Sequence, residues 1–168
     1  MIHEVKKRQN ISVMVWAAFW RAKQSELYKL EQNFEIKKQS YSANFYIQVL
    51  KDNLLEIWEP DLIFMQNNAL IHSAHRVCDW FTEMSIEVIN WPSYLSDLNL
   101  IEHLWFRLKE LIYEIRPDIE TVSEGEDTVR AVLLKALQEA WSRITREYMN
   151  TLIRSMNSKV NAVIKAEE

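Results

Sequence analysis

The sequence predicts an α/β fold in which a short mixed sheet is flanked by helices and the C-terminal part is helical. Apolar runs of strand length alternate with segments whose apolar side chains recur at helical spacing, and from about residue 100 onward the spacing is helical. Hydrophobic residues make up 48% of the 168 residues, which is enough to bury the core of one domain.

Four segments are predicted as strands. Residues 11–20 form a near-continuous apolar run rich in β-branched and aromatic side chains, which is typical of a strand buried on both faces. Residues 25–31 alternate weakly and predict a more exposed strand, whereas residues 61–65 and 87–90 predict short buried strands. Residues 1–3 are not expected to form a buried strand. Because strands separated by helices usually run parallel, we expect a mainly parallel sheet.

The other regular segments are predicted as helices. Residues 43–58 carry apolar side chains at helical spacing before Pro60, and a second helix follows His72. The segment from about Leu100 has the clearest period, and the residues after Gly125 continue with one long apolar stripe and two shorter ones. Four tryptophans on the apolar segments are expected in the core: Trp16, Trp80, Trp105 and Trp141.

The composition excludes several classes of site. Gly125 is the single glycine, so tight left-handed turns and glycine-rich phosphate loops are not expected. Cys78 is the single cysteine, which excludes an internal disulfide and a thiolate zinc site. No run approaches the roughly 20 apolar residues of a membrane span. With a net charge of −4, any contact with nucleic acid has to be local or supplied by a part outside this chain.

Polar residues collect where two of the predicted strands end. In an open α/β sheet, functional side chains gather at the carboxyl ends of strands, which indicates residues 66–68 and the loop after residue 90. The first segment reads FMQNNALIH from Phe64 to His72, and the second reads WPSYLSDLNLIEHLW from Trp91 to Trp105. These two segments contain the residues most suited to chemistry.

The two segments resemble the catalytic motifs of the Tc/mariner superfamily of DDE transposases. The family's second catalytic aspartate lies in Q-D-N-A-P-x-H, and its third acidic residue lies in W-P-x-x-S-P-D-L-N-P-I-E-x-x-W. The matching positions are Asn67 and Glu102, and the 34 residues between them equal the family's spacing. Residues 13–18, and residues 155–156 with 162–164, resemble further segments of the family. Six residues support the two motifs: Gln66, Asn68, His72, Asp97, Asn99 and Trp105.

The resemblance implies an RNase H-like fold in which three carboxylates hold two divalent ions, Mg²⁺ or Mn²⁺, for DNA cleavage and strand transfer. Mg²⁺ prefers oxygen ligands, and two such ions close together need several negative charges to offset their repulsion. The resemblance also implies that the catalytic positions Asn67 and Glu102 are the metal ligands. Transposon-end DNA as the partner and the nucleus as the location follow from the family in the same way.

The sequence departs from the family pattern at the positions that matter most. Asn67 keeps an oxygen where the second aspartate belongs but lacks its charge, and only Glu4 among the acidic residues precedes the strand of residues 11–20. The first catalytic strand and the family's N-terminal helix-turn-helix DNA-binding region have no counterpart, so residues 1–168 are expected to be one partial catalytic domain. Of the three acids only Glu102 is left. One carboxylate cannot hold a metal pair.

Local patterns offer plainer interpretations for the same residues. Glu102 follows Asn99 by three positions, which is the spacing of a capping box at a helix start, and Asn67 alone is typical of a turn. His72, His75 and Asp79 have helical spacing but no partner pair elsewhere, so a zinc site is not favoured. His103 lies on a different helix face from its neighbour Glu102 and is expected to be exposed.

Three functions are therefore open. The first is a degenerate, catalytically inactive transposase fragment. The alternative is a non-catalytic module that keeps the fold and binds nucleic acid, an intact transposase or a second copy of itself, with no membrane partner. The third is an active nuclease that uses Asp97 together with Glu102 as substitute metal ligands.

Overall fold

The computed structural model describes residues 2–6, 11–30, 42–67, 69–89, 98–121 and 125–167. The chain divides into two compact units. Unit 1 comprises Met1–Leu30 together with Leu100–Glu168, and unit 2 comprises Glu31–Asn99. The first candidate motif lies in unit 2, and Glu102 of the second motif lies in unit 1.

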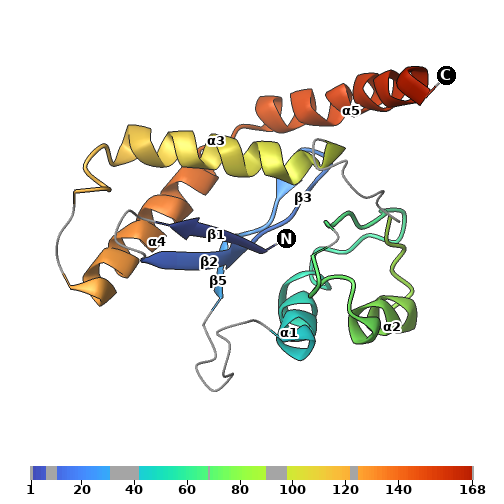
Figure 1. The fold of residues 1–168 in the computed structure, drawn as a ribbon, viewed down its shortest axis with the longest axis horizontal. Helices are drawn as coiled ribbons and strands as arrows, with labels where there is room; N and C mark the ends of the chain where they lie inside the picture. Colours follow the sequence, from blue (N-terminus) through green and yellow to red (C-terminus); the bar gives the residue numbers. More distant parts are fainter. Residues whose placement is uncertain are drawn as a thin grey trace. The chain divides into compact units, whose positions relative to one another are not determined.

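Unit 1 contains a three-stranded sheet with the order β1-β2-β5 (Figure 1). Its strands are β1 (Ile2–Lys6), β2 (Ser12–Trp16) and β5 (Tyr28–Leu30). Both pairings are antiparallel, so the prediction of a mainly parallel sheet is wrong for these strands. The reason is the short connection between β1 and β2, because parallel neighbours need a crossover of a dozen or more residues. Strand β1 includes Ile2 and His3, and the prediction that residues 1–3 are not a buried strand stays a prediction as to burial.

A separate hairpin follows β2 in unit 1. Strands β3 (Phe19–Trp20) and β4 (Lys23–Gln24) are joined by Arg21 and Ala22, whose φ angles are 44° and 58°. A two-residue hairpin turn with both φ angles positive matches the right-handed twist of its strands, although such turns usually contain glycine. The expectation that the scarcity of glycine excludes left-handed turns is therefore wrong. The predicted strand of residues 11–20 is divided between β2 and β3.

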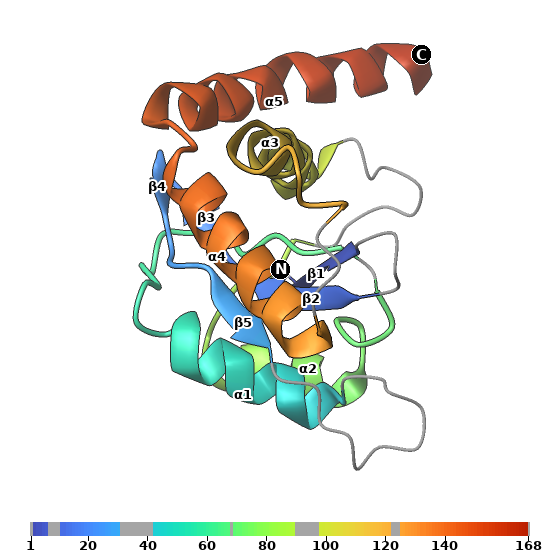
Figure 2. The same cartoon turned by 90° about the vertical axis from the view of Figure 1, so that its left-hand side faces the viewer.

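Three helices complete unit 1: α3 (Leu100–Ile115), α4 (Glu126–Ser142) and α5 (Arg146–Glu167). Helix α4 packs on β2, and α3 packs on both α4 and α5 (Figures 1 and 2). All of the strongly periodic segments after residue 100 are helical, as predicted. The two shorter apolar stripes after α4 both lie on α5.

Buried tryptophans hold α3, α4 and the sheet together. Trp16, Trp105 and Trp141 are all at most 4% exposed, and the rings of Trp105 and Trp141 stack with their centroids 5.5 Å apart. A charged side chain adds a polar contact, because Arg130 of α4 donates from Nη1 to the carbonyl oxygen of Ser12 at 2.7 Å. The predicted place of Trp16, Trp105 and Trp141 in the core is confirmed.

Unit 2 is built on two helices and a minimal parallel pairing. Helix α1 (Ala43–Asn53) packs against α2 (His75–Glu83). Phe64 forms a single parallel bridge with Val88, in which Phe64 N donates to the Glu87 carbonyl at 2.7 Å. The strands predicted at residues 61–65 and 87–90 are therefore reduced to one bridge within the described residues.

Aromatic packing forms the core of unit 2. The Phe81 ring lies 5.2 Å from the ring of Phe64 and 5.1 Å from that of Trp80, and both contacts are buried. Ser42 caps the N-terminal end of α1, because its hydroxyl accepts from Phe45 N at 3.2 Å. The helix ends at Asn53 rather than at the predicted residue 58. The result is a small core that holds the segment carrying Asn67.

Candidate active site

The two predicted catalytic positions belong to different units of the structure. Gln66 and Asn67 follow the Phe64 bridge in unit 2, with Gln66 buried and Asn67 half-buried. Glu102 lies in the first turn of α3 in unit 1, and its side chain is exposed. Asn68 and Asp97 lie outside the described residues, so their predicted supporting roles stay predictions. The geometry of each position is given within its own unit.

A buried hydrogen-bonded chain supports the first motif. The hydroxyl of Tyr46 in α1 donates to Gln66 Oε1 at 2.7 Å, and Gln66 Nε2 donates to the His72 carbonyl at 3.3 Å. The rings of Tyr46 and His72 lie 4.6 Å apart. Burial raises the pKa of Tyr46, so its hydroxyl stays neutral and remains a donor. These hydrogen bonds therefore connect Tyr46 of α1 to Gln66 and, through it, to His72.

The side-chain oxygen of Asn67 is engaged by two donors within the same motif. His72 Nδ1 lies 2.7 Å from Asn67 Oδ1 and 3.2 Å from the Asn67 carbonyl oxygen. Ala69 N also donates to Oδ1, at 3.3 Å. Because the backbone N–H of Ala69 can only donate, the acceptor atom of the Asn67 amide has to be the one that faces it. This closes an Asx turn at the predicted catalytic position.

The two oxygen partners fix the state of the His72 ring. An oxygen acceptor at Nδ1 requires the proton to be on Nδ1, so Nε2 carries the lone pair. His72 is 3% exposed, and its burial lowers the pKa of the imidazole to about 4. Nε2 is buried without a hydrogen-bond partner in the part of the chain that the structure describes. At neutral pH, His72 is an uncharged donor to Asn67.

Glu102 differs from Asn67 in lying at the surface of its unit. Desolvation by the surrounding protein raises the pKa of the Glu102 carboxyl, and Lys109 and His103 act in the opposite direction. Asn99, predicted as its capping partner, is buried directly before α3. The capping contacts themselves stay a prediction.

His103 is half-buried, which corrects the expectation that it is exposed. Its Nε2 lies 2.6 Å from Nζ of Lys159 in α5, and Tyr148 donates to its carbonyl oxygen at 3.4 Å. Helix α5 packs beside α3 and covers this residue. The contact joins residues 56 positions apart, and no local pattern in the sequence indicates it.

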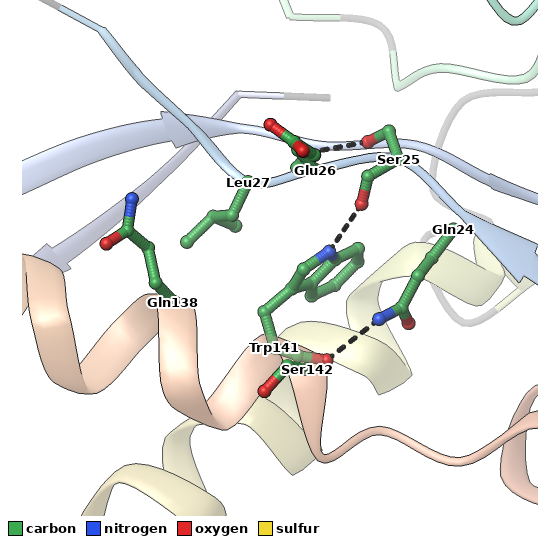
Figure 3. Close-up of a pocket in the computed structure, with 7 residues that line it drawn as sticks. All are labelled: Gln24, Ser25, Glu26, Leu27, Gln138, Trp141 and Ser142. Carbon is green, nitrogen blue, oxygen red and sulfur yellow. Dashed lines mark hydrogen bonds between the residues drawn. The ribbon is translucent and has the colours of Figure 1, made fainter.

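A surface pocket of about 350 Å³ lies elsewhere in unit 1. Figure 3 shows the Trp141 indole pointing from α4 to the segment after β4, where Nε1 donates to the Ser25 carbonyl at 2.7 Å. Gln24 Nε2 donates to the Trp141 carbonyl at 3.0 Å. Glu26 is the single carboxylate in its lining, so the pocket lacks the donor set of a metal centre.

The described residues do not fit a divalent metal pair. They contain no group of three or more His, Cys, Asp or Glu side chains that could hold a metal ion, and this includes the His72, His75 and Asp79 set. Of the two predicted catalytic positions, Asn67 has a side-chain oxygen that already accepts two hydrogen bonds, and Glu102 supplies the one carboxylate. None of the helices in the described residues is long and apolar enough to cross a membrane.

The fold is that of an RNase H-like catalytic domain. The structure matches the crystal structure of the catalytic domain of Mos1 mariner transposase with a TM-score of 0.64, at 16% sequence identity, over 93% of this chain and 74% of that one. A structure of the same domain with raltegravir and Mg matches with a TM-score of 0.66 at 16% identity, over 93% of this chain and 75% of that one.

Sequence comparison then identifies the family. The DDE superfamily endonuclease family matches residues 3–124. The Tc3 transposase of Caenorhabditis elegans is 30% identical over 93% of this chain and 44% of its own length. The Tc1 transposase of the same organism is 28% identical over 92% of this chain and 52% of its own length. The chain belongs to the DDE superfamily endonucleases of the Tc/mariner transposase type, and it spans about half the length of these curated relatives.

Proposed function

We propose that this chain is a degenerate transposase domain that keeps the RNase H-like fold and does not cleave DNA. The observation that carries the proposal is the state of Asn67, whose side-chain oxygen accepts from His72 Nδ1 at 2.7 Å and from Ala69 N at 3.3 Å. A metal ligand at this position has to offer an oxygen lone pair and, next to a second cation, a negative charge. Asn67 offers neither.

Turning the Asn67 side chain toward a metal ion would break both hydrogen bonds. His72 Nδ1 would lose its 2.7 Å acceptor and keep only the Asn67 carbonyl oxygen at 3.2 Å. The net loss of one such hydrogen bond costs about 0.5–1.5 kcal/mol. The neutral amide gains less from a divalent cation than a carboxylate does, because the charge–charge attraction is missing. Both effects act against metal binding.

From its family membership we also propose a partner, a location and a domain extent for this chain. Nucleic acid is its binding partner, the nucleus is its location, and residues 1–168 correspond to one partial catalytic domain. The coverage of about half of each curated relative supports the last of these. Mg²⁺ or Mn²⁺ is the cofactor of the intact enzymes in this proposal and does not act in this chain.

The test is nicking of supercoiled plasmid DNA in Mg²⁺ and in Mn²⁺, with an active Tc/mariner transposase as the positive control. We expect no metal-dependent nicking by the wild-type chain. Glu102→Ala is the control variant, because cleavage that persists in it comes from a contaminating nuclease. Metal-dependent nicking that Glu102→Ala abolishes would refute the proposal and favour a nuclease that uses Glu102, with Asp97 as the next ligand to test.

A second candidate function is a binding module for an intact transposase or for a second copy of this chain. The hydrogen bonds that join Tyr46, Gln66 and His72 favour it, because a satisfied buried polar network keeps this segment rigid enough to present a defined surface. Co-purification with an intact transposase, together with light scattering of the chain alone, tests this function. A chain that stays monomeric and binds neither protein nor DNA contradicts it.

A further inference from the structure

The pocket of unit 1 is lined by side chains whose hydrogen-bond donors are largely in use. It has a volume of about 350 Å³ and lies between the C-terminal end of α4 and the chain that begins in β4 (Figure 3). Gln24 Nε2 and Trp141 Nε1 each donate to a backbone carbonyl. The Ser25 hydroxyl donates to the Glu26 carbonyl at 2.7 Å, and the Ser142 hydroxyl donates within its own helix. These bonds occupy the indole N–H and both hydroxyl protons.

Acceptors in the same lining are left over. Gln24 Oε1 is buried and has no hydrogen-bond partner in the part of the chain that the structure describes. Its position is fixed, because the Trp141 carbonyl can only accept and therefore has to face the amide nitrogen of Gln24. The exposed Glu26 carboxylate adds a negative charge and two more acceptor atoms. A buried acceptor without a donor is unfavourable, so the lining favours a ligand that brings N–H groups.

The rest of the pocket combines apolar surface with an absence of positive charge. Figure 3 shows Leu27 and Gln138 on one side of the Trp141 indole and Gln24 on the other, with Glu26 at the edge. Leu27 and Trp141 are buried and apolar, and Gln138 is exposed. The described residues of the lining include no Lys, Arg or His. A cation can therefore enter without meeting a like charge in the lining.

We propose that this pocket binds a guanidinium group carried on an apolar stem. A guanidinium offers a planar fork of N–H donors, which is enough to supply both the Glu26 carboxylate and Gln24 Oε1. It is also more weakly hydrated than an ammonium ion, so it is moved more readily next to a buried acceptor. Leu27 and the Trp141 ring supply apolar surface for the stem. The volume lies at the lower end of the range for ligand pockets, about 300–1,000 Å³.

The guanidinium can come from two sources with the same chemistry. One is an arginine side chain that a partner protein presents, and the other is a free small molecule. Two compounds separate these sources, because N-acetylarginine N-methylamide carries a peptide backbone and ethylguanidinium does not. The inference goes beyond the proposed function, since the pocket requires neither metal nor nucleic acid.

The experiment is a titration of the ¹⁵N-labelled chain with ethylguanidinium, followed by ¹H–¹⁵N NMR. The reporters are the indole N–H of Trp141 and the side-chain amide of Gln24, because both groups line the pocket. We expect both resonances to shift and to saturate, while the indole resonance of Trp80, which is buried in unit 2, stays unchanged. N-ethylurea, which has a similar shape but no charge, should bind much more weakly.

Two variants test the contribution of the Glu26 charge. Glu26→Gln keeps the shape of an exposed side chain, so it should fold normally and bind ethylguanidinium about fivefold more weakly. Asp127→Asn is the matched control, because Asp127 is exposed at the opposite end of α4 and its variant loses the same charge. This control should change the affinity less than about 1.5-fold, since salt screens distant charges.

Reporter resonances that stay unchanged would mean that water alone fills the pocket, and this outcome overturns the inference. Equal affinities for ethylguanidinium and N-ethylurea, or equal losses in the two variants, overturn it as well. Binding of N-acetylarginine N-methylamide at least as tightly as ethylguanidinium assigns the pocket to an arginine side chain, whereas binding of ethylguanidinium alone assigns it to a free small molecule. Either of these two results supports the proposal.

Discussion

At the residue scale, the first motif depends on the neutral state of His72. Its Nδ1–H is the donor that holds Asn67, and its ring lies against Tyr46 in the interior of unit 2. A protonated imidazole would place a positive charge in this buried position and a second N–H at Nε2, where the described residues supply no acceptor. The stability of unit 2 should therefore depend on pH through this one residue.

We predict that the free energy of unfolding falls as the pH is lowered from about 6.5 to about 4. The pKa of His72 is about 4 in the folded chain and about 6.5 when unfolded, so the unfolded state binds the proton first. The stabilisation is complete above the unfolded value and is lost as the pH approaches the folded value. Neutral His72 should contribute at most roughly 3 kcal/mol to the free energy of unfolding. Urea unfolding at a series of pH values between 6.5 and 4 measures this contribution.

The control is His72→Asn, whose side-chain amide can replace the Nδ1 donor but does not titrate. This variant should be less stable at pH 7, since it fills less of the core, and its stability should vary less between pH 6.5 and 4. A wild-type slope that His72→Asn leaves unchanged would assign the pH dependence to other groups.

The candidate site could be predicted only in part from the sequence. Asn67 and Glu102 could be predicted as candidate positions because each lies in a contiguous motif. In the sequence, Tyr46 cannot be distinguished from the other apolar residues of its predicted helix. Its hydrogen bond to Gln66 joins residues 20 positions apart, so no local pattern indicates it. The contact of Lys159 with His103 spans a still longer separation, and side-chain contacts of this kind depend on tertiary packing that periodicity does not encode.

At the element scale, Trp141 connects α4 to the segment after β4. Its Nε1 donates to the Ser25 carbonyl, and its ring stacks on Trp105. We predict that Trp141→Phe lowers the free energy of unfolding by about 2–4 kcal/mol, because the Ser25 acceptor loses its donor and a cavity remains. Equilibrium unfolding in urea measures the change.

Trp58→Phe is the matched control for that substitution. Trp58 is half-buried in unit 2, and its replacement should cost less than about 1 kcal/mol. Equal losses in the two variants would mean that the indole hydrogen bond of Trp141 contributes little to stability.

The helices were predictable and the strand pairings were not, for a physical reason. The apolar residues of α3 recur at helical spacing, and this spacing predicts both the helix and its buried face. An apolar strand carries no comparable signal for the direction of its partner, and the antiparallel pairing of β1 with β2 depends on the connection between them. The turn at Arg21 and Ala22 was missed because the pairing of β3 with β4 imposes a conformation that these residue types rarely adopt.

At the scale of the whole molecule, the division into two compact units predicts two local stabilities. Val77 on α2 and Val129 on α4 are both fully buried, one in each unit. Replacing either by alanine should cost about 2 kcal/mol. We expect Val77→Ala to accelerate hydrogen exchange mainly at amides of residues 42–89, and Val129→Ala mainly at those of unit 1. Uniform acceleration throughout the chain in both variants would show that the chain unfolds as one cooperative unit.

The long-range contacts of unit 1 also affect how the chain folds during its synthesis. Arg130 reaches back to Ser12, 118 positions earlier, and Trp141 reaches back to Ser25, 116 positions earlier. Translation adds about 5–20 residues per second, so Arg130 of α4 is synthesised roughly 6–24 seconds after Ser12 of β2. Until then α4 cannot cover the apolar face of β2. During that interval the nascent chain presents an uncovered strand to the cytosol, so chaperones that hold emerging polypeptides have a long window in which to bind it.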